Sequence, residues 1–183
     1  MDELTQFLAG PPPIIPMDAG WAGHKRAVLA EAIRIQSIPA PTFHEQDRAQ
    51  YVFRRFTEIG LGAVRQDELG NVYASTPGAD PTAPLLLVSA HLDTVFGQDT
   101  DLTIRQDTQE KRVYGPGIGD NSLGLAALIW LAQQIQERGI VPQSPIQWVA
   151  GCTPTGPAPS ITSSRSGPPF STRSKQPAAH KAP

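Results

Sequence analysis

Three side chains that could bind a metal ion, His91, Asp93 and Asp120, lie in two short polar stretches of the sequence. The first stretch, residues 89–94 (SAHLDT), ends an apolar run that is typical of a buried strand. The second, residues 115–122 (GPGIGDNS), is a glycine-rich loop just before an apolar helical segment. An imidazole nitrogen is a good ligand for zinc, and a carboxylate can bridge two ions. The two stretches therefore predict part of a metal site, with further ligands expected later in the chain.

Asp93 follows His91 by two positions, so a continuing strand would turn both side chains to the same side. From there Asp93 could orient the imidazole and tune the site. Simpler interpretations remain open. A His-x-Asp after a strand is commonly a hydrogen-bonded surface pair, and residues 120–122 could be an ordinary helix-capping cluster. A small nucleotide-binding module is a further alternative, but the glycines at 115, 117 and 119 lack the spacing of the dinucleotide fingerprint.

Alternating helices and strands are expected to position these residues. Apolar spacing predicts helices over residues 21–36 and 42–59, with Thr42 as N-cap and Glu45 as its reciprocal capping partner, and a third helix from Ser122 to about Gly139. Strands are predicted at 64–67 and 72–75 as a hairpin, at 102–105 and 112–114 as a second hairpin, and at 146–150. The uninterrupted apolar run 85–89 predicts a central strand covered on both faces. This order predicts an α/β fold, a mixed sheet flanked by helices.

Composition divides the 183 residues into three parts. Residues 1–20 are predicted to be a proline-rich arm, residues 21–151 a partial catalytic domain, and residues 152–183 a disordered tail rich in Pro and Ser. The net charge of −2 divides into −6 for residues 1–150 and +4 for the remainder. Because phosphate binding needs a basic face, a mildly acidic body argues against a nucleic-acid partner.

Cysteine content and hydropathy indicate the cellular compartment in which the protein is expected. The single cysteine, Cys152, allows no intrachain disulfide, which suits a reducing cytoplasm. The acidic N-terminus lacks the features of a signal peptide, and no apolar run is long enough to span a membrane. A cytoplasmic protein with no membrane partner is therefore expected.

The two motifs together resemble the M20 family of metallopeptidases and amidohydrolases, most of all its peptidase T-like branch. The resemblance rests on residues 89–95 (SAHLDTV), 114–124 (YGPGIGDNSLG) and the upstream hairpin 68–72 (ELGNV), and it covers roughly residues 24–150. It implies that His91 ligates one ion of a two-zinc centre, that Asp120 bridges both ions, and that Asp93 is a catalytic-site residue that holds His91. It further implies a cis peptide bond after Asp120, a Glu general base, and a peptide or N-acyl amino acid as substrate.

Several features that the resemblance implies have no counterpart in this sequence. The family's adjacent Glu pair should follow the strand at 146–150, yet no Asp or Glu occurs after Glu137. The later acidic and His ligands and the dimerisation domain are also absent, since the remaining histidine, His180, lies in the tail. The abrupt change of composition at residue 151 predicts a frameshifted, mis-spliced or mispredicted reading frame from there onward. Because too few ligands are present, we expect very weak metal binding and no peptidase activity. We also expect an unpaired sheet edge with an exposed apolar face. The alternative is a non-catalytic pseudoenzyme or interaction fragment.

Overall fold

The computed structural model describes residues 20–151. The tail lies outside the described residues, as does the N-terminal arm except for Gly20. The helices are α2 (Gly20–Gln36), α3 (Gln46–Ile59) and α4 (Leu123–Glu137). A short irregular turn, η1 (Ile118–Ser122), precedes α4, and the backbone angles of Asp120 and Asn121 in it are not helical. The strands are β1 (Gly62–Gln66), β2 (Val72–Thr76), β3 (Leu86–His91), β4 (Arg105–Asp107), β5 (Arg112–Tyr114) and β6 (Ile146–Gly151).

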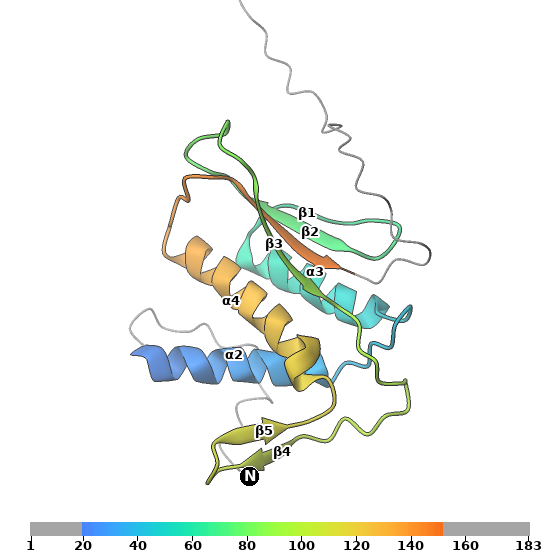
Figure 1. Ribbon diagram of the computed structural model, residues 1–183. Helices are drawn as coiled ribbons and strands as arrows, with labels where there is room; N and C mark the ends of the chain where they lie inside the picture. The colour runs from blue at the N-terminus through green and yellow to red at the C-terminus, as the bar shows by residue number, and fades with distance from the viewer. Residues whose placement is uncertain (1–19, 152–183) are drawn as a thin grey trace, which may run out of the picture.

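The main sheet has four strands in the order β1-β2-β6-β3. The pairs β1–β2 and β2–β6 are antiparallel, whereas β3 and β6 are parallel, so the sheet is mixed. β4 and β5 form a separate antiparallel hairpin (Figure 1). The predicted α/β class with a mixed sheet flanked by helices is confirmed.

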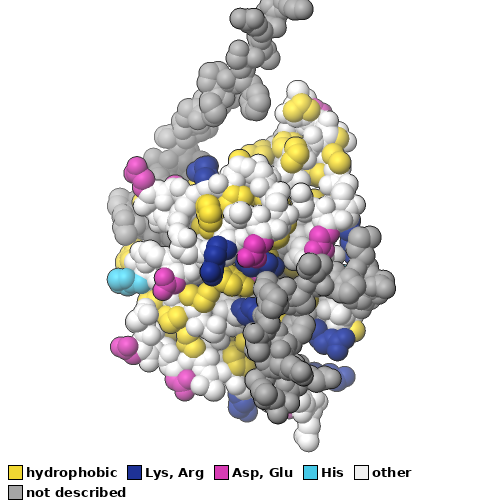
Figure 2. Space-filling view, turned by 180° about the vertical axis from the view of Figure 1, so that it is seen from behind, with side chains coloured by type: hydrophobic (Ala, Val, Ile, Leu, Met, Phe, Trp, Pro, Cys, Tyr) yellow, Lys and Arg dark blue, Asp and Glu magenta, His cyan; other side chains and the backbone are white. Residues whose placement is uncertain are grey.

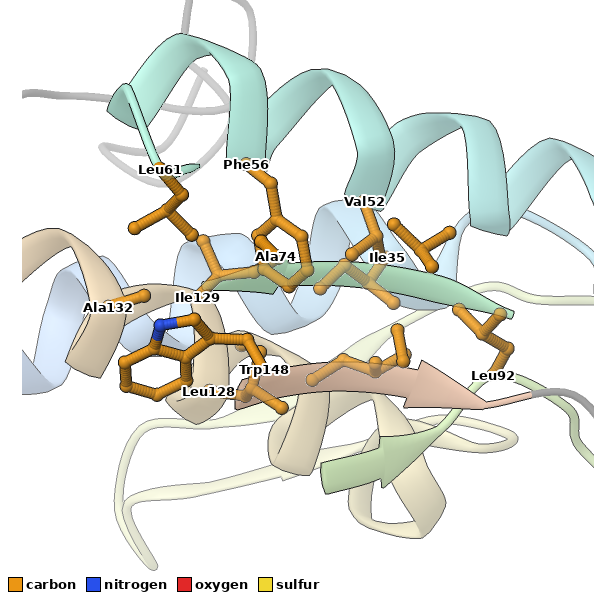
Figure 3. Packing of buried hydrophobic residues seen from close by; sticks show 14 of the residues in the cluster. Ile35, Val52, Phe56, Leu61, Ala74, Leu92, Leu128, Ile129, Ala132 and Trp148 are labelled. Atoms are coloured by element: carbon orange, nitrogen blue, oxygen red, sulfur yellow. The ribbon is translucent and has the colours of Figure 1, made fainter. Parts of the chain in front are cut away.

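Helices α3 and α4 pack against the same sheet, α3 beneath β1 and β2 and α4 beneath β3 and β6. Helix α2 crosses α4 on the side away from the sheet (Figure 1). Alternate residues of β2 and β6 are buried, as expected where one face of each strand meets a helical layer. Figure 3 shows the resulting core, where side chains of α3 and α4 meet those of the strands: Val52, Phe56, Ala74, Leu128, Ile129, Ala132 and Trp148.

The connection from α2 to α3 differs from the sequence prediction. Thr42 is not the N-cap of α3; that position belongs to Glu45, which makes no side-chain cap hydrogen bond. The physical reason is a tight turn, closed by the His44 N–H donating to the Pro41 carbonyl at 2.8 Å, which delays the start of the helix. Glu45 Oε1 accepts instead from the Phe43 N–H at 2.8 Å. At the other end, Gly60 ends α3 in the left-handed conformation.

The first strand of the second hairpin also begins later than predicted, at Arg105 rather than residue 102. The Asp101 carboxylate accepts hydrogen bonds from both the N–H and the hydroxyl of Thr103. Such local side-chain bonds favour a turn over a strand.

The prediction that β3 is a central strand covered on both faces is wrong. Among the described residues only β6 pairs with it, so β3 is an edge strand. Its residues Val88 and Ala90 pack against the core, but Leu86 and Leu87 are largely exposed. The apolar run of β3 is therefore long enough for a buried strand but is covered on one face. Within residues 20–151, β3 thus has the expected unpaired edge and exposed apolar side chains.

Surface charge and helix length are relevant to the expectation that the protein has neither a nucleic-acid nor a membrane partner. Basic and acidic side chains are interspersed among apolar ones on the face that Figure 2 shows. Within residues 20–151 no helix has the length and apolar character needed to cross a membrane. The absence of a nucleic-acid partner stays a prediction.

Candidate metal site

His91, Asp93 and Asp120 meet at the carboxyl end of β3. The imidazole of His91, the last residue of that strand, lies between the two carboxylates. Its Nδ1 is 3.1 Å from Asp93 Oδ1, and its Nε2 is 2.9 Å from Asp120 Oδ1. Side-chain exposure is 47% for His91, 15% for Asp93 and 83% for Asp120. The structure thus joins the three residues on which the sequence prediction rests and leaves the His91–Asp120 side open to solvent.

Glycine lets the loop that carries Asp120 approach the segment after β3. Gly117 has φ = 69°, and a Cβ there would lie 3.0 Å from the Thr94 methyl group. Gly124 faces Asn121 so closely that a Cβ would collide with the Asn121 amide. The Asp120–Asn121 peptide bond is cis, as the resemblance implied. A side chain at 117 would therefore be strained by the positive φ and crowded against Thr94.

Packing also accounts for the glycines that suggested a nucleotide-binding loop. A Cβ at Gly115 would collide with Ile104 Cδ1, and Gly117 is held against Thr94. These two glycines therefore serve close packing within the protein.

A second group of residues supports Asp93 and was not singled out as functional by the sequence. Thr42 Oγ1 donates to Asp93 Oδ2 at 2.9 Å. Arg48 lies below, fully buried, and donates to the carbonyl oxygens of Leu92 and Ile38. Burial lowers the pKa of Arg48 to about 10, against the opposing effect of the Asp93 charge. The sequence pattern that drew attention to Thr42 was the capping box with Glu45, which predicted a helix start and not a contact with the candidate site.

The donors present match zinc chemistry in kind. An imidazole nitrogen and a carboxylate oxygen, 2.9 Å apart, are the atoms that zinc prefers, and Asp93 occupies the other imidazole nitrogen as an orienting partner would. The residues fit an ion between His91 Nε2 and Asp120. Within residues 20–151, however, no cluster of three or more His, Cys, Asp or Glu side chains could hold a metal ion. The described part of the site is therefore a two-donor arrangement.

Comparison with known proteins confirms the resemblance to this group of peptidases and amidohydrolases. The model for peptidase family M28 matches residues 71–151, which include all three site residues. N-carbamoyl-L-amino acid amidohydrolase of Geobacillus stearothermophilus is 30% identical over 109 residues, 60% of this chain. The cytosol non-specific dipeptidase of Escherichia coli K12 is 30% identical over 110 residues, 52% of this chain. The chain spans only 22% of the length of each of these relatives.

Solved structures of the same group share the fold. A tripeptidase from Staphylococcus aureus superposes with a TM-score of 0.56 at 25% identity, over 68% of this chain and 35% of its own. Aminopeptidase PepT from Bacillus cereus gives 0.57 at 18% identity, with the same coverage of 68% and 35%. A dinuclear metal-binding peptidase of the M20 family from Bacillus subtilis gives 0.52 at 18% identity, over 74% of this chain and 36% of its own. The M20-type resemblance and the catalytic-domain fold predicted from the sequence both hold.

Proposed function

We propose that residues 20–151 are part of the catalytic domain of a metal-dependent hydrolase of peptide or amide bonds, with His91 and Asp120 as metal ligands. One observation carries the proposal: His91 Nε2 and Asp120 Oδ1 converge to 2.9 Å from motifs 29 residues apart, at a strand end where ligands bind in open α/β sheets. Both side chains are open to solvent, so an ion held between them would remain accessible to a substrate.

Each of the three residues has a distinct part in the proposed centre. His91 Nε2 and an Asp120 oxygen donate to the metal, and Asp93 accepts from His91 Nδ1, which fixes the ring orientation. When bound, zinc ions of such centres lower the pKa of a coordinated water and polarise the scissile carbonyl. Two zinc ions are proposed for the complete centre, which is supported by the neighbour described as dinuclear.

The relatives suggest the substrate class and the location. They are named as a dipeptidase, a tripeptidase and an N-carbamoyl amino acid amidohydrolase. We therefore propose a peptide or an N-acyl amino acid as substrate. A cytoplasmic location is proposed alongside it, supported by the relative named as cytosolic.

For the 183-residue chain itself we propose very weak metal binding and no hydrolysis. A catalytic zinc is held by about three protein ligands. The described residues bring two together, and no Asp or Glu follows Glu137 in the sequence. A non-catalytic fragment that keeps the fold is the second candidate, favoured by this same two-donor arrangement.

Cobalt titration of the full chain, followed by visible absorption, tests the ligand assignment. The parent chain should give only a weak cobalt signal at high cobalt concentration, and His91→Ala and Asp120→Ala should each remove it. His44→Ala and Asp99→Ala, at exposed residues of the same types, should leave it unchanged. Cobalt binding that is equal in His91→Ala and in the parent chain would overturn the assignment. Hydrolysis of di- or tripeptides that depends on added metal would instead overturn the proposed inactivity.

A further inference from the structure

We propose that Thr42 is a positioning residue for His91, acting through the Asp93 carboxylate. The effect of Thr42 on metal binding rests on the proposed metal role of His91. The two contacts that link the Thr42 hydroxyl to Asp93 and Asp93 to the imidazole, here called the relay, do not depend on that role.

The two oxygens of Asp93 have separate partners. Oδ2 accepts from Thr42 Oγ1 at 2.9 Å, and Oδ1 lies 3.1 Å from His91 Nδ1. The main-chain carbonyl oxygen of Asp93 lies at the same distance of 3.1 Å from His91 Nδ1, so the carboxylate shares this nitrogen with the carbonyl. The terminal torsion of an aspartate is broad, so one hydrogen bond alone would let the carboxylate turn. With a partner on each oxygen, rotation would break one bond or the other. Because the Asp93 side chain is mostly buried, water would replace a lost partner poorly. Thr42 therefore limits the carboxylate to the orientation that faces His91.

Thr42 is itself held by the turn that surrounds it. The turn runs from Pro41 to His44, with Phe43 at φ = 74°, and the Glu45 carboxylate accepts from the Phe43 N–H. A positive φ at this position is typical of type II turns. The second residue of such a turn is Thr42, whose side chain is thus presented to Asp93.

The turn is also attached to the segment that carries Asp93. The Thr94 N–H donates to the Ala40 carbonyl at 2.7 Å, and Pro41 forms a parallel bridge with Thr94. These contacts join the two residues before Thr42 to the residue after Asp93. The hydroxyl therefore approaches Asp93 from a backbone that is already in register with it.

A purely structural role for Thr42 makes a different prediction. In that case Thr42→Val, which replaces the hydroxyl by a methyl of similar size, would lower stability and leave the His91 ring unchanged. In the positioning role the ring changes, and Thr42→Ser, which keeps the hydroxyl, restores it. The two roles are separable by observing the imidazole directly.

Nitrogen-15 NMR of the metal-free full chain at one fixed pH provides that observation, with the His91 signals assigned by their loss in His91→Gln. We expect the parent chain and Thr42→Ser to show a hydrogen-bonded Nδ1 proton. In Thr42→Val this proton should exchange faster and the Nδ1 shift should move. In an Asp93→Asn background, Thr42→Val should have no further effect. Thr42→Ala carries the same test should Thr42→Val fail to fold.

Zinc affinity gives the functional readout. Loss of a partner that orients a ligand directly costs roughly 10- to 100-fold in affinity. Thr42 is one step further away, so Thr42→Val should weaken binding by about 3- to 10-fold and Thr42→Ser should not. Identical His91 nitrogen signals in the parent chain and Thr42→Val would overturn the inference. A changed His91 signal together with His91-independent metal binding would overturn the proposed function and leave the relay standing.

Discussion

The Arg48 guanidinium donates a hydrogen bond of 2.9 Å to the main-chain carbonyl of Leu92, 44 residues further along the sequence. Leu92 lies between His91 and Asp93, so this bond fixes the backbone that presents both. A second bond, of 2.6 Å, runs from Arg48 to the Ile38 carbonyl just after α2. One side chain of α3 therefore ties the end of α2 to the candidate site.

Replacing Arg48 by methionine should destabilise the protein strongly. Met keeps much of the length of the side chain but leaves two carbonyl oxygens, one of them in a buried hydrogen bond, without a donor. Each loss costs about 1–3 kcal/mol, so we expect a decrease of about 2–5 kcal/mol in the free energy of unfolding. Urea denaturation measures it. Arg54→Met, at an exposed arginine of the same helix, should change stability by about 0.5 kcal/mol or less. Equal losses in the two variants would contradict the role of Arg48.

The Tyr51 phenol links α2 to α3 and should make stability depend on alkaline pH. Its hydroxyl donates to Glu31 Oε1 at 3.0 Å, beside the Arg55–Glu31 ion pair. Burial and then the Glu31 charge raise the pKa of Tyr51 above its usual value near 10. Above that pH the unfolded chain releases the phenolic proton while the folded chain retains it, so stability falls as pH rises.

Tyr51→Phe tests this linkage. At pH 7 the variant should be less stable by about 1 kcal/mol because it lacks the hydrogen bond to Glu31. It also lacks the titrating phenol, so the stability difference should shrink as pH increases from about 9 to about 11. Denaturation curves at several pH values measure both effects. A difference that stays constant across this range would refute the assignment.

Among residues 20–151, Thr76 is the hydrogen-bond acceptor for the indole N–H of Trp148. The indole Nε1 donates to Thr76 Oγ1 at 2.9 Å, and both residues are buried. Thr76→Val should leave the indole N–H without an acceptor and cost about 1–3 kcal/mol of stability. Thr76→Ser keeps the hydroxyl and should recover most of the hydrogen-bond contribution. Chemical denaturation compares the two variants, and a serine variant no more stable than the valine variant would show that packing, not the hydrogen bond, matters at Thr76.

Local patterns predicted most of the fold. Apolar periodicity located α2, α3 and α4, because each buries one face against a neighbouring layer, and short strand-type runs located β2 and β6. The position of β3 at the edge could not be obtained this way. An apolar run reports that a strand can be buried, whereas strand order depends on pairing between distant segments.

In the candidate site, too, local relationships were predictable from the sequence and a long-range one was not. His91 and Asp93 are near neighbours, so their contact follows from the strand, and the glycine loop suggested that Asp120 could approach. The role of Thr42 was not predictable, because a threonine three residues before a glutamate is typical of a helix cap. Its actual partner, Asp93, lies 51 residues away, and only the folded chain brings the two together.

The exposed edge of β3 should promote self-association, and one substitution can test this. Leu87 is 61% exposed on an edge strand whose outer backbone groups have no strand partner within residues 20–151. Natural proteins commonly protect such edges with lysine, since a charge opposes pairing with another strand. Leu87→Lys should therefore reduce concentration-dependent association in size-exclusion chromatography. Because Leu87 lies outside the core, stability should change by about 0.5 kcal/mol or less.

Two control variants separate the edge from general surface hydrophobicity. Val141→Lys removes a similarly exposed apolar side chain that lies outside the strands, so it should leave association unchanged. Val88→Lys, one residue from Leu87 but packed against the core, should unfold the protein because it brings a charge into an apolar layer. If Leu87→Lys and Val141→Lys reduce association equally, the cause is exposed apolar area in general. If Leu87→Lys alone reduces it, the association proceeds through the unpaired edge of β3.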